Sequence, residues 1–166
     1  MFLFRLDKSA LILRRMTSTK PEQTASDTGW VTSHIGVNRF RTEIRARSHF
    51  LVADEPFAVG GRDDGPTPYD LLLASLGACM AMTLRMYADR KKWPLEDVRV
   101  RLRTSSSHAE DCVQCDTAEV GLTTLEYDVE LSGPLDDEQR TRILAIAERC
   151  PIKQTLGRGV RVVKAR

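Results

Sequence analysis

The sequence predicts one α+β domain in which antiparallel strands surround a long buried helix. Three observations lead to this prediction. The chain has 166 residues, the length of a single domain. Segments with alternating apolar and polar residues, typical of half-buried strands, lie on both sides of one long apolar helical segment. The resulting order is strands, a long helix, two strands, a helix and a strand, which favours antiparallel pairing over repeated βαβ units.

Composition excludes several other classes of protein. Hydrophobic residues make up 42% and charged residues 29%, as in ordinary soluble domains. The net charge of +2 is smaller than the basic excess of most nucleic-acid-binding proteins. No uninterrupted apolar run reaches the roughly 18 residues that span a bilayer. Four cysteines are too few for a disulfide scaffold and suit a reducing compartment. We therefore expect a cytoplasmic protein with neither a nucleic-acid nor a membrane partner.

Residues 1–29 differ from the rest of the chain. The first fifteen residues are apolar and contain arginine, residues 17–29 are polar, and the first twenty carry a local charge of +4. This segment is either a targeting helix followed by a flexible lead-in, or translation starts at Met16 and the preceding residues are an artefact. We treat 1–29 as a flexible or targeting extension and 30–166 as the domain.

The first third of the domain predicts a small group of strands. Apolar and polar residues alternate over 40–46, which predicts a strand. The turn before this strand predicts that it pairs with a strand over Val31–Ile35. Short strands are also expected over 50–53 and Phe57–Val59. The Gly- and Asp-rich segment 60–66 is expected to be a loop.

A long helix is predicted directly after this loop. Thr67 is a candidate N-cap, Pro68 suits the first helical position, and Asp70 is the acidic residue three positions after the cap. Residues 71–82 contain no charged side chain. A helix that is apolar on every face is buried, either in a core or in a subunit interface. Pro94 is expected to stop it.

The remaining segments complete the predicted fold. Arginines alternate with apolar residues over 98–103, and acids do so over 125–131, so these strands are expected to pair with arginine opposite acid. Residues 136–149 predict an amphipathic helix. A short helical turn is expected to begin at Cys150-Pro151, and a last strand is expected over 160–164.

Two cysteines lie in contexts that suit thiol chemistry. Cys79, within the apolar helix, either fills a gap in the core or forms a thiol in a dry pocket. Cys150 precedes Pro151 and is either a structural cysteine or an N-cap, where the helix dipole would lower its thiol pKa. Such a pair permits a two-step reaction in which one sulfur is oxidised to a sulfenic acid and the other condenses with it to a disulfide.

A second cysteine pair raises the question of metal binding. Cys112 and Cys115 form a Cys-x-x-Cys motif, and His108 lies four residues before it. The spacing suits a zinc knuckle, but structural zinc takes four ligands and the chain has no second pair. Glu110, Asp111 or a residue of another subunit could complete a site. A bound metal and a peripheral redox pair are both less favoured than a metal-free loop.

The run from Gly65 to Cys79, together with Cys150-Pro151-Ile152 downstream, resembles the OsmC/Ohr family of cysteine-based peroxidases. The resemblance extends over about residues 30–166. It implies an intertwined homodimer with active sites at the interface and no cofactor. It also implies that Cys79 is the peroxidatic cysteine, which attacks a small organic hydroperoxide, and that Cys150 is the resolving cysteine. An external dithiol would then reduce the disulfide. The dipole argument alone would instead make Cys150 the more reactive sulfur.

The sequence departs from the family pattern at one catalytic carboxylate. Family members carry a glutamate directly after the proline that begins the helix, where it holds a catalytic arginine. Here Tyr69 occupies that position, and Asp70 follows one residue later, about 100° further around the helix. We assign the catalytic carboxylate to Asp70 and the cation to Arg62, with Arg39 and Arg41 as rivals.

Two functions follow from these observations. The first is a thiol-dependent peroxidase that reduces organic hydroperoxides in oxidative stress defence. The apolar helix around Cys79 favours an apolar substrate. The alternative is a non-catalytic OsmC-like module that binds a small apolar ligand or senses redox state or metal. The missing glutamate and the loop containing Cys112 and Cys115 motivate the alternative.

Overall fold

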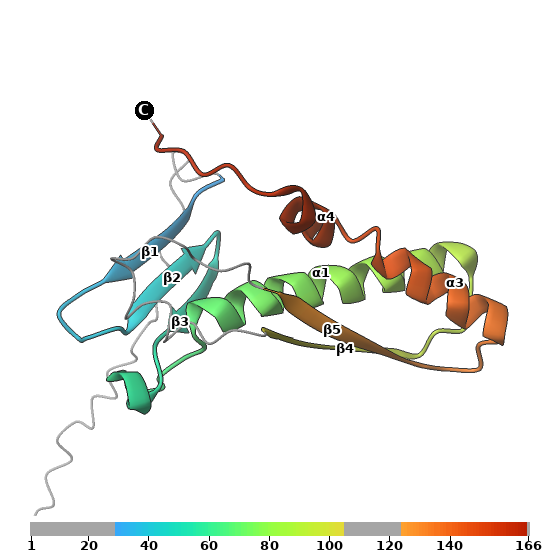
Figure 1. Cartoon of the computed structure of the whole chain (residues 1–166), viewed down its shortest axis with the longest axis horizontal. Helices are drawn as coiled ribbons and strands as arrows, with labels where there is room; N and C mark the ends of the chain where they lie inside the picture. Colours follow the sequence, from blue (N-terminus) through green and yellow to red (C-terminus); the bar gives the residue numbers. More distant parts are fainter. Residues whose placement is uncertain (1–28, 105–123, 166) are drawn as a thin grey trace, which may run out of the picture.

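The computed structural model describes residues 29–104 and 124–165 and confirms the α+β fold (Figure 1). Its strands and helices, in chain order, are β1 (Val31–Ile35), β2 (Thr42–Ala46), β3 (His49–Ala53), the 3₁₀ helix η2 (Phe57–Val59), α1 (Pro68–Lys91), β4 (Asp97–Thr104), β5 (Leu125–Ser132), α3 (Asp137–Ala147) and α4 (Pro151–Arg158). The predicted helices all form, and helix α1 is the long central element.

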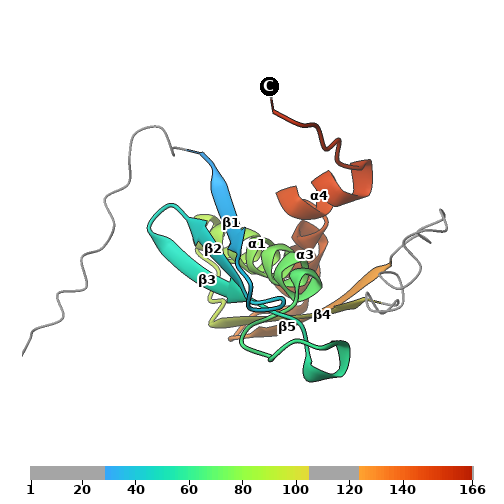
Figure 2. The same ribbon diagram turned by 90° about the vertical axis from the view of Figure 1, so that its left-hand side faces the viewer.

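The strands form two separate antiparallel sheets. One sheet has the order β1-β2-β3 and lies at the N-terminal end of α1 (Figure 1). The other consists of β4 and β5, which run beneath α1 while α4 lies above it, as the view turned by 90° also shows (Figure 2). Along this second pair, Arg99 lies opposite Glu130 and Arg101 opposite Asp128, so the predicted pairing of arginine with acid is confirmed. Both members of each pair are mostly exposed on the outer face.

The start of α1 is fixed by the predicted capping box. The Thr67 hydroxyl accepts the Asp70 backbone N–H at 3.1 Å, and the Asp70 carboxylate accepts the Thr67 backbone N–H at 3.0 Å. Pro68 occupies the first turn, where no backbone N–H is needed. The helix ends at Lys91, and the C-cap residue Lys92 adopts a left-handed conformation. The segment that carries Cys79 is therefore held in register by its own sequence.

Removing this cap should weaken the domain measurably. We expect Thr67→Ala to lower the free energy of unfolding by about 1 kcal/mol, because the Asp70 N–H loses its acceptor. Thr67→Ser keeps the hydroxyl and should stay close to the wild type. Urea denaturation followed by circular dichroism measures both, and equal stability of the alanine and serine variants would contradict the prediction.

One continuous core lies between α1, the β4–β5 sheet, α3 and α4. Leu84 and Met80 of α1 and Ile143 of α3 are completely buried in it, as is Cys150. Alternate residues of β4 and β5 pack against the cluster from below. The arginine–acid pairs thus lie on the solvent side, and the apolar residues between them face the core.

The apolar surface of α1 is only partly covered in the single chain. Its core face is buried, whereas Met82 is 65% and Met86 71% exposed. The expectation of burial on every face is therefore wrong for the chain by itself, because the core covers one side of the helix. By length and composition alone, α1 also meets the criterion for a membrane span, which corrects the statement that no apolar segment is long enough. Its contribution to the core identifies it as the central helix of this domain.

Two predicted strands are absent from the described residues. Phe57–Val59 forms a 3₁₀ helix instead of a strand. The segment is held in a compact loop because the buried Asp54 carboxylate accepts hydrogen bonds from the backbone N–H groups of Glu55, Arg62 and Asp64. Residues 160–164 form no regular element and pair with no strand that the structure describes, and Val162 is 90% exposed. The predicted extension 1–29 lies outside the described residues except for Gly29, and the loop after β4 lies outside them beyond Thr104.

Candidate active site

The two cysteines singled out in the sequence meet in the structure. Cys79 lies midway along α1, and Cys150 is the N-cap residue of α4, which packs against α1. Both are free thiols, and they lie close enough for Cys79 to raise the pKa of the Cys150 thiol. The fold thus brings together two sulfurs that are far apart in the chain.

The environments of the two thiols differ. Cys150 is completely buried in the core cluster, whereas Cys79 is only partly buried at its edge. Burial raises the pKa of the Cys150 thiol, and the neighbouring Cys79 raises it further. The backbone N–H groups of Lys153 and Ile152 act in the opposite direction but do not cancel the effect of burial. The expectation that the helix start lowers the pKa of the Cys150 thiol is therefore wrong. The pKa is raised, because desolvation outweighs the effect of the N–H groups.

An open groove of about 540 Å³ runs between α1 and α4, and its lining includes Leu76 and Lys153, each three residues from one of the cysteines. Its apolar wall includes Leu72 and Leu76, which lie on the same face of α1 as Cys79 because the spacings are four and three residues. Lys153 and Leu156 of α4 line the facing side. A small apolar molecule in this groove would lie within one helical turn of Cys79.

The groove also contains polar residues that sequence reasoning missed. Tyr127 of β5 and Lys153 of α4 line it, and both contact Glu148 at the end of α3. Lys153 could have been found from the sequence, because it lies three residues after Cys150 and hence in the first turn of α4. Tyr127 and Glu148 carry no such signal, because only the packing of β5 against α3 and α4 brings them to the site.

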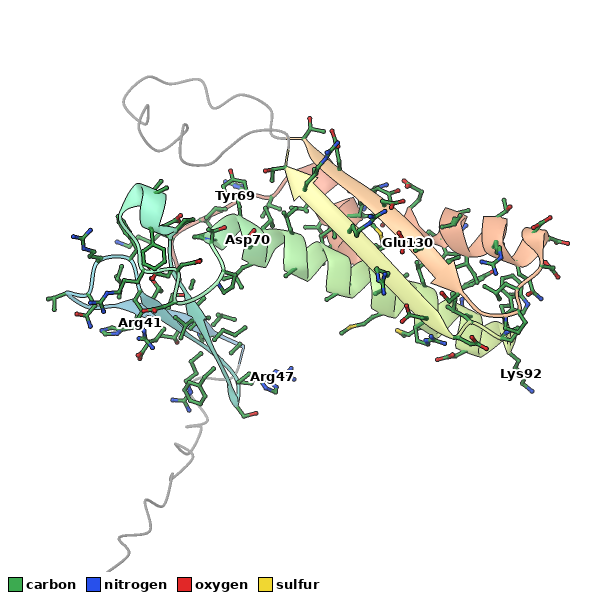
Figure 3. The ribbon with its side chains drawn as sticks, turned by 90° about the horizontal axis from the view of Figure 1, so that it is seen from below. Arg41, Arg47, Tyr69, Asp70, Lys92 and Glu130 are labelled. Carbon is green, nitrogen blue, oxygen red and sulfur yellow. The ribbon has the colours of Figure 1, made fainter. Side chains whose placement is uncertain are left out.

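Asp70 serves as the helix cap in this structure. It lies at the start of α1, nine residues or about 13 Å before Cys79 along the helix axis. Its carboxylate accepts the Thr67 N–H and hydroxyl. Figure 3 shows Asp70 beside Tyr69 at the N-terminal end of the helix.

The three candidate arginines lie with the N-terminal sheet and its loop. Arg39 donates to the Gly60 carbonyl, and Arg41 pairs with Glu43. Arg62 belongs to the loop that is organised around Asp54 and is exposed. In Figure 3, Arg41 lies in the small sheet beyond the start of α1. Within the described part of the single chain, none of the contacts made by these three arginines involves either thiol.

The proposed zinc ligands lie outside the described residues. This applies to His108, Cys112 and Cys115, together with the neighbouring acids. Within residues 29–104 and 124–165, no group of three His, Cys, Asp or Glu side chains could hold a metal ion.

Cys79 and Cys150 both lie within a segment shared with known proteins. The family model described as OsmC-like protein matches residues 61–163, well over half of the chain. The chain belongs to the OsmC-like family. No protein with a curated description matches the sequence of this OsmC-like protein.

Several solved structures share its fold. The OsmC-like protein from Mycoplasma pneumoniae superimposes with a TM-score of 0.61 at 18% identity, covering 76% of this chain and 85% of that chain. An organic hydroperoxide resistance protein OsmC from Legionella pneumophila gives 0.56 at 24% identity, with 75% and 85% covered. An organic hydroperoxide resistance protein from Elizabethkingia anophelis gives 0.54 at 18% identity, with 75% and 84% covered. At these identities the likeness establishes the OsmC-like fold.

Proposed function

We propose that this OsmC-like protein is a thiol-dependent peroxidase that reduces organic hydroperoxides. Cys79 is the peroxidatic cysteine and Cys150 the resolving cysteine. The observation that carries the proposal is the proximity of these two free thiols, since Cys150 belongs to the core cluster and Cys79 packs against that cluster. It is supported by the fold shared with proteins named for organic hydroperoxide resistance.

The reaction takes place in two steps. The Cys79 thiolate attacks one peroxide oxygen, the O–O bond breaks, and the other oxygen leaves as the alcohol after taking up a proton. Cys79 is thereby oxidised to a sulfenic acid. The Cys150 sulfur then attacks Cys79, water leaves, and a Cys79–Cys150 disulfide forms. An external dithiol returns both cysteines to thiols by exchange and becomes a disulfide itself.

The burial of the two sulfurs supports this division of roles. A peroxide must reach the first sulfur, and Cys79 is the partly exposed one, three residues after Leu76 of the groove wall. Cys150 is completely buried and has a raised pKa, so it stays protonated at neutral pH and out of reach of peroxide. The apolar groove wall favours an alkyl hydroperoxide over hydrogen peroxide, which gains little from apolar contact.

We also propose that a second copy of the chain completes the site in an intertwined homodimer. The exposed Met82 and Met86 leave an apolar surface on α1, and Phe50 of β3 is 60% exposed on the separate small sheet. A second chain covering these surfaces would remove apolar area from water. The same arrangement could bring the Arg62 loop of one chain to Cys79 of the other. Asp70 would then contribute by fixing the end of that loop through the cap.

Trapping the oxidised protein tests the proposal. After one equivalent of tert-butyl hydroperoxide, we expect peptide mass spectrometry to find a Cys79–Cys150 disulfide and one equivalent of tert-butanol. With Cys150→Ser, the product should be a sulfenic acid on Cys79 that dimedone traps. The matched control, Cys112→Ser/Cys115→Ser, should still form the disulfide. If Cys79 remains a thiol while other cysteines oxidise, the proposal is wrong.

The second candidate function is a non-catalytic module that binds a small apolar ligand or senses redox state or metal. It is favoured by the role of Asp70 as a cap and by the placement of the arginines away from the thiols within the single chain. Zinc analysis of the purified protein separates the metal sensor from the peroxidase. Stoichiometric zinc that disappears in Cys112→Ser/Cys115→Ser would favour the sensor, and rapid oxidation of Cys79 in metal-free protein would favour the peroxidase.

A further inference from the structure

Three polar side chains from different elements form a closed cluster next to Cys150. The Tyr127 hydroxyl donates to Glu148 Oε1 at 2.5 Å, and Lys153 Nζ donates to the same oxygen at 2.5 Å. Lys153 Nζ also donates to the Tyr127 hydroxyl at 3.1 Å and lies 4.6 Å from the centre of its ring. We call this cluster of Tyr127, Glu148 and Lys153 the polar clamp.

The polar clamp is the main specific attachment of α4. None of the eight residues of α4 is fully buried, and its N-cap makes no side-chain hydrogen bond. Ile152 and Leu156 contribute half-buried apolar contacts to the core. Among the described residues, Lys153 is the one α4 side chain with a hydrogen bond. The first turn of α4 is therefore bound to β5 and to the end of α3 largely through this cluster.

The position of this first turn determines how accessible Cys150 is. Cys150 caps α4 and is completely buried, and the backbone N–H groups of Ile152 and Lys153 approach its sulfur. Lys153 thus has its backbone N–H near Cys150 and its side chain in the clamp. A reagent from solvent reaches this sulfur only when the first turn of α4 moves.

We propose that the polar clamp holds the first turn of α4 closed over Cys150, so that external thiols attack the disulfide at Cys79. This use of the clamp rests on the proposed peroxidase function, whereas the shielding of Cys150 does not. A reductant thiolate attacks the Cys79 sulfur, the S–S bond breaks, and Cys150 leaves with the electron pair and takes up a proton. The second thiol of the reductant then attacks the mixed disulfide and releases Cys79 as a thiolate. The N–H groups of Ile152 and Lys153 partly offset the cost of burial for the departing Cys150 thiolate, which the proton then neutralises.

The shielding can be tested without any peroxidase activity. In a Cys79→Ser/Cys112→Ser/Cys115→Ser background, Cys150 is the single thiol, and its alkylation by iodoacetamide is followed by mass spectrometry. We expect slow alkylation in this background and a rate about fivefold higher after Lys153→Met or Glu148→Gln, because the clamp loses its charged hydrogen bond. Lys153→Arg, which restores the cation, should return the rate towards the background value.

Two controls distinguish local opening of α4 from general destabilisation. Arg103→Gln removes a comparable ion pair to Glu126 on the same strand as Tyr127 and should leave the alkylation rate unchanged. Hydrogen exchange should increase in peptides of α4 in the Lys153→Met variant but not in peptides of α1. An unchanged rate in Lys153→Met, or faster exchange throughout the domain, would overturn the clamp.

The same variants with all four cysteines present link the clamp to the proposed function. We expect the oxidised wild type, treated briefly with N-acetylcysteine and then unfolded in excess N-ethylmaleimide, to carry N-acetylcysteine on Cys79 and maleimide on Cys150. Lys153→Met should give a mixture of both attachment sites. A wild-type mixture would overturn the selectivity. If no disulfide forms on oxidation, the peroxidase proposal fails, while the alkylation result still decides the shielding.

Discussion

Replacing Cys79 by serine is expected to abolish catalysed consumption of organic hydroperoxide. A serine hydroxyl is far less nucleophilic than a thiolate at neutral pH and cannot form a sulfenic acid. The hydroxyl would fit the space of the thiol at the edge of the core, where Cys79 is only partly buried, so the fold should be kept. The measurement is the loss of tert-butyl hydroperoxide in the presence of dithiothreitol, compared with a reaction without protein.

Cys150→Ser provides the mechanistic counterpart of this variant. Without a resolving sulfur, the first molecule of peroxide should still be reduced, because Cys79 and the groove beside it are intact. Repeated turnover needs the Cys79–Cys150 disulfide, because this disulfide is what the dithiol reduces. In the variant, peroxide consumption should therefore stop after about one equivalent per chain. Undiminished peroxide consumption by Cys79→Ser would contradict the assignment of the peroxidatic cysteine, and undiminished multiple turnover by Cys150→Ser would contradict that of the resolving cysteine.

Ile143→Ala is expected to cause the largest loss of stability among the substitutions considered. Ile143 is completely buried in the cluster that also contains Leu84 and Cys150. Truncation removes apolar contacts and leaves a cavity, which typically costs about 2–5 kcal/mol in the free energy of unfolding. Urea denaturation of the reduced protein, monitored by far-UV circular dichroism, measures the change.

The neighbouring residue supplies a matched control. Leu144 lies next to Ile143 in α3 but is 43% exposed, so Leu144→Ala changes the same helix without opening a core cavity. We expect it to cost clearly less than Ile143→Ala. Equal losses would show that helix propensity, rather than packing against α1 and Cys150, determines the stability of this face.

Elements with a strong local signal were correctly predicted. The capping box at Thr67 and Asp70 contains all of its hydrogen-bonding partners within four residues, so the start of α1 could be read directly. Pro151 likewise marked the start of α4. The pairing of β4 with β5 followed from their opposite charge patterns. In each case the deciding interaction lies within one segment or between two complementary patterns.

Elements that depend on distant partners were not correctly predicted. Phe57–Val59 has the composition of a strand, but the buried carboxylate of Asp54 organises its surroundings into a compact loop with a 3₁₀ turn. Residues 160–164 have a strand-like pattern and no partner in the described part of the chain. A strand needs a neighbour to satisfy its backbone groups, and a local pattern does not specify that neighbour.

The amino-acid sequence by itself determined the family, the capped apolar helix around Cys79 and the helix start at Cys150, because these are properties of short contiguous segments. Only the tertiary structure showed that the two cysteines lie close together, that burial rather than the helix dipole dominates the pKa of the Cys150 thiol, and that Tyr127, Glu148 and Lys153 meet beside it. Desolvation and side-chain contact depend on which distant segments pack together, and that packing is a property of the whole folded chain.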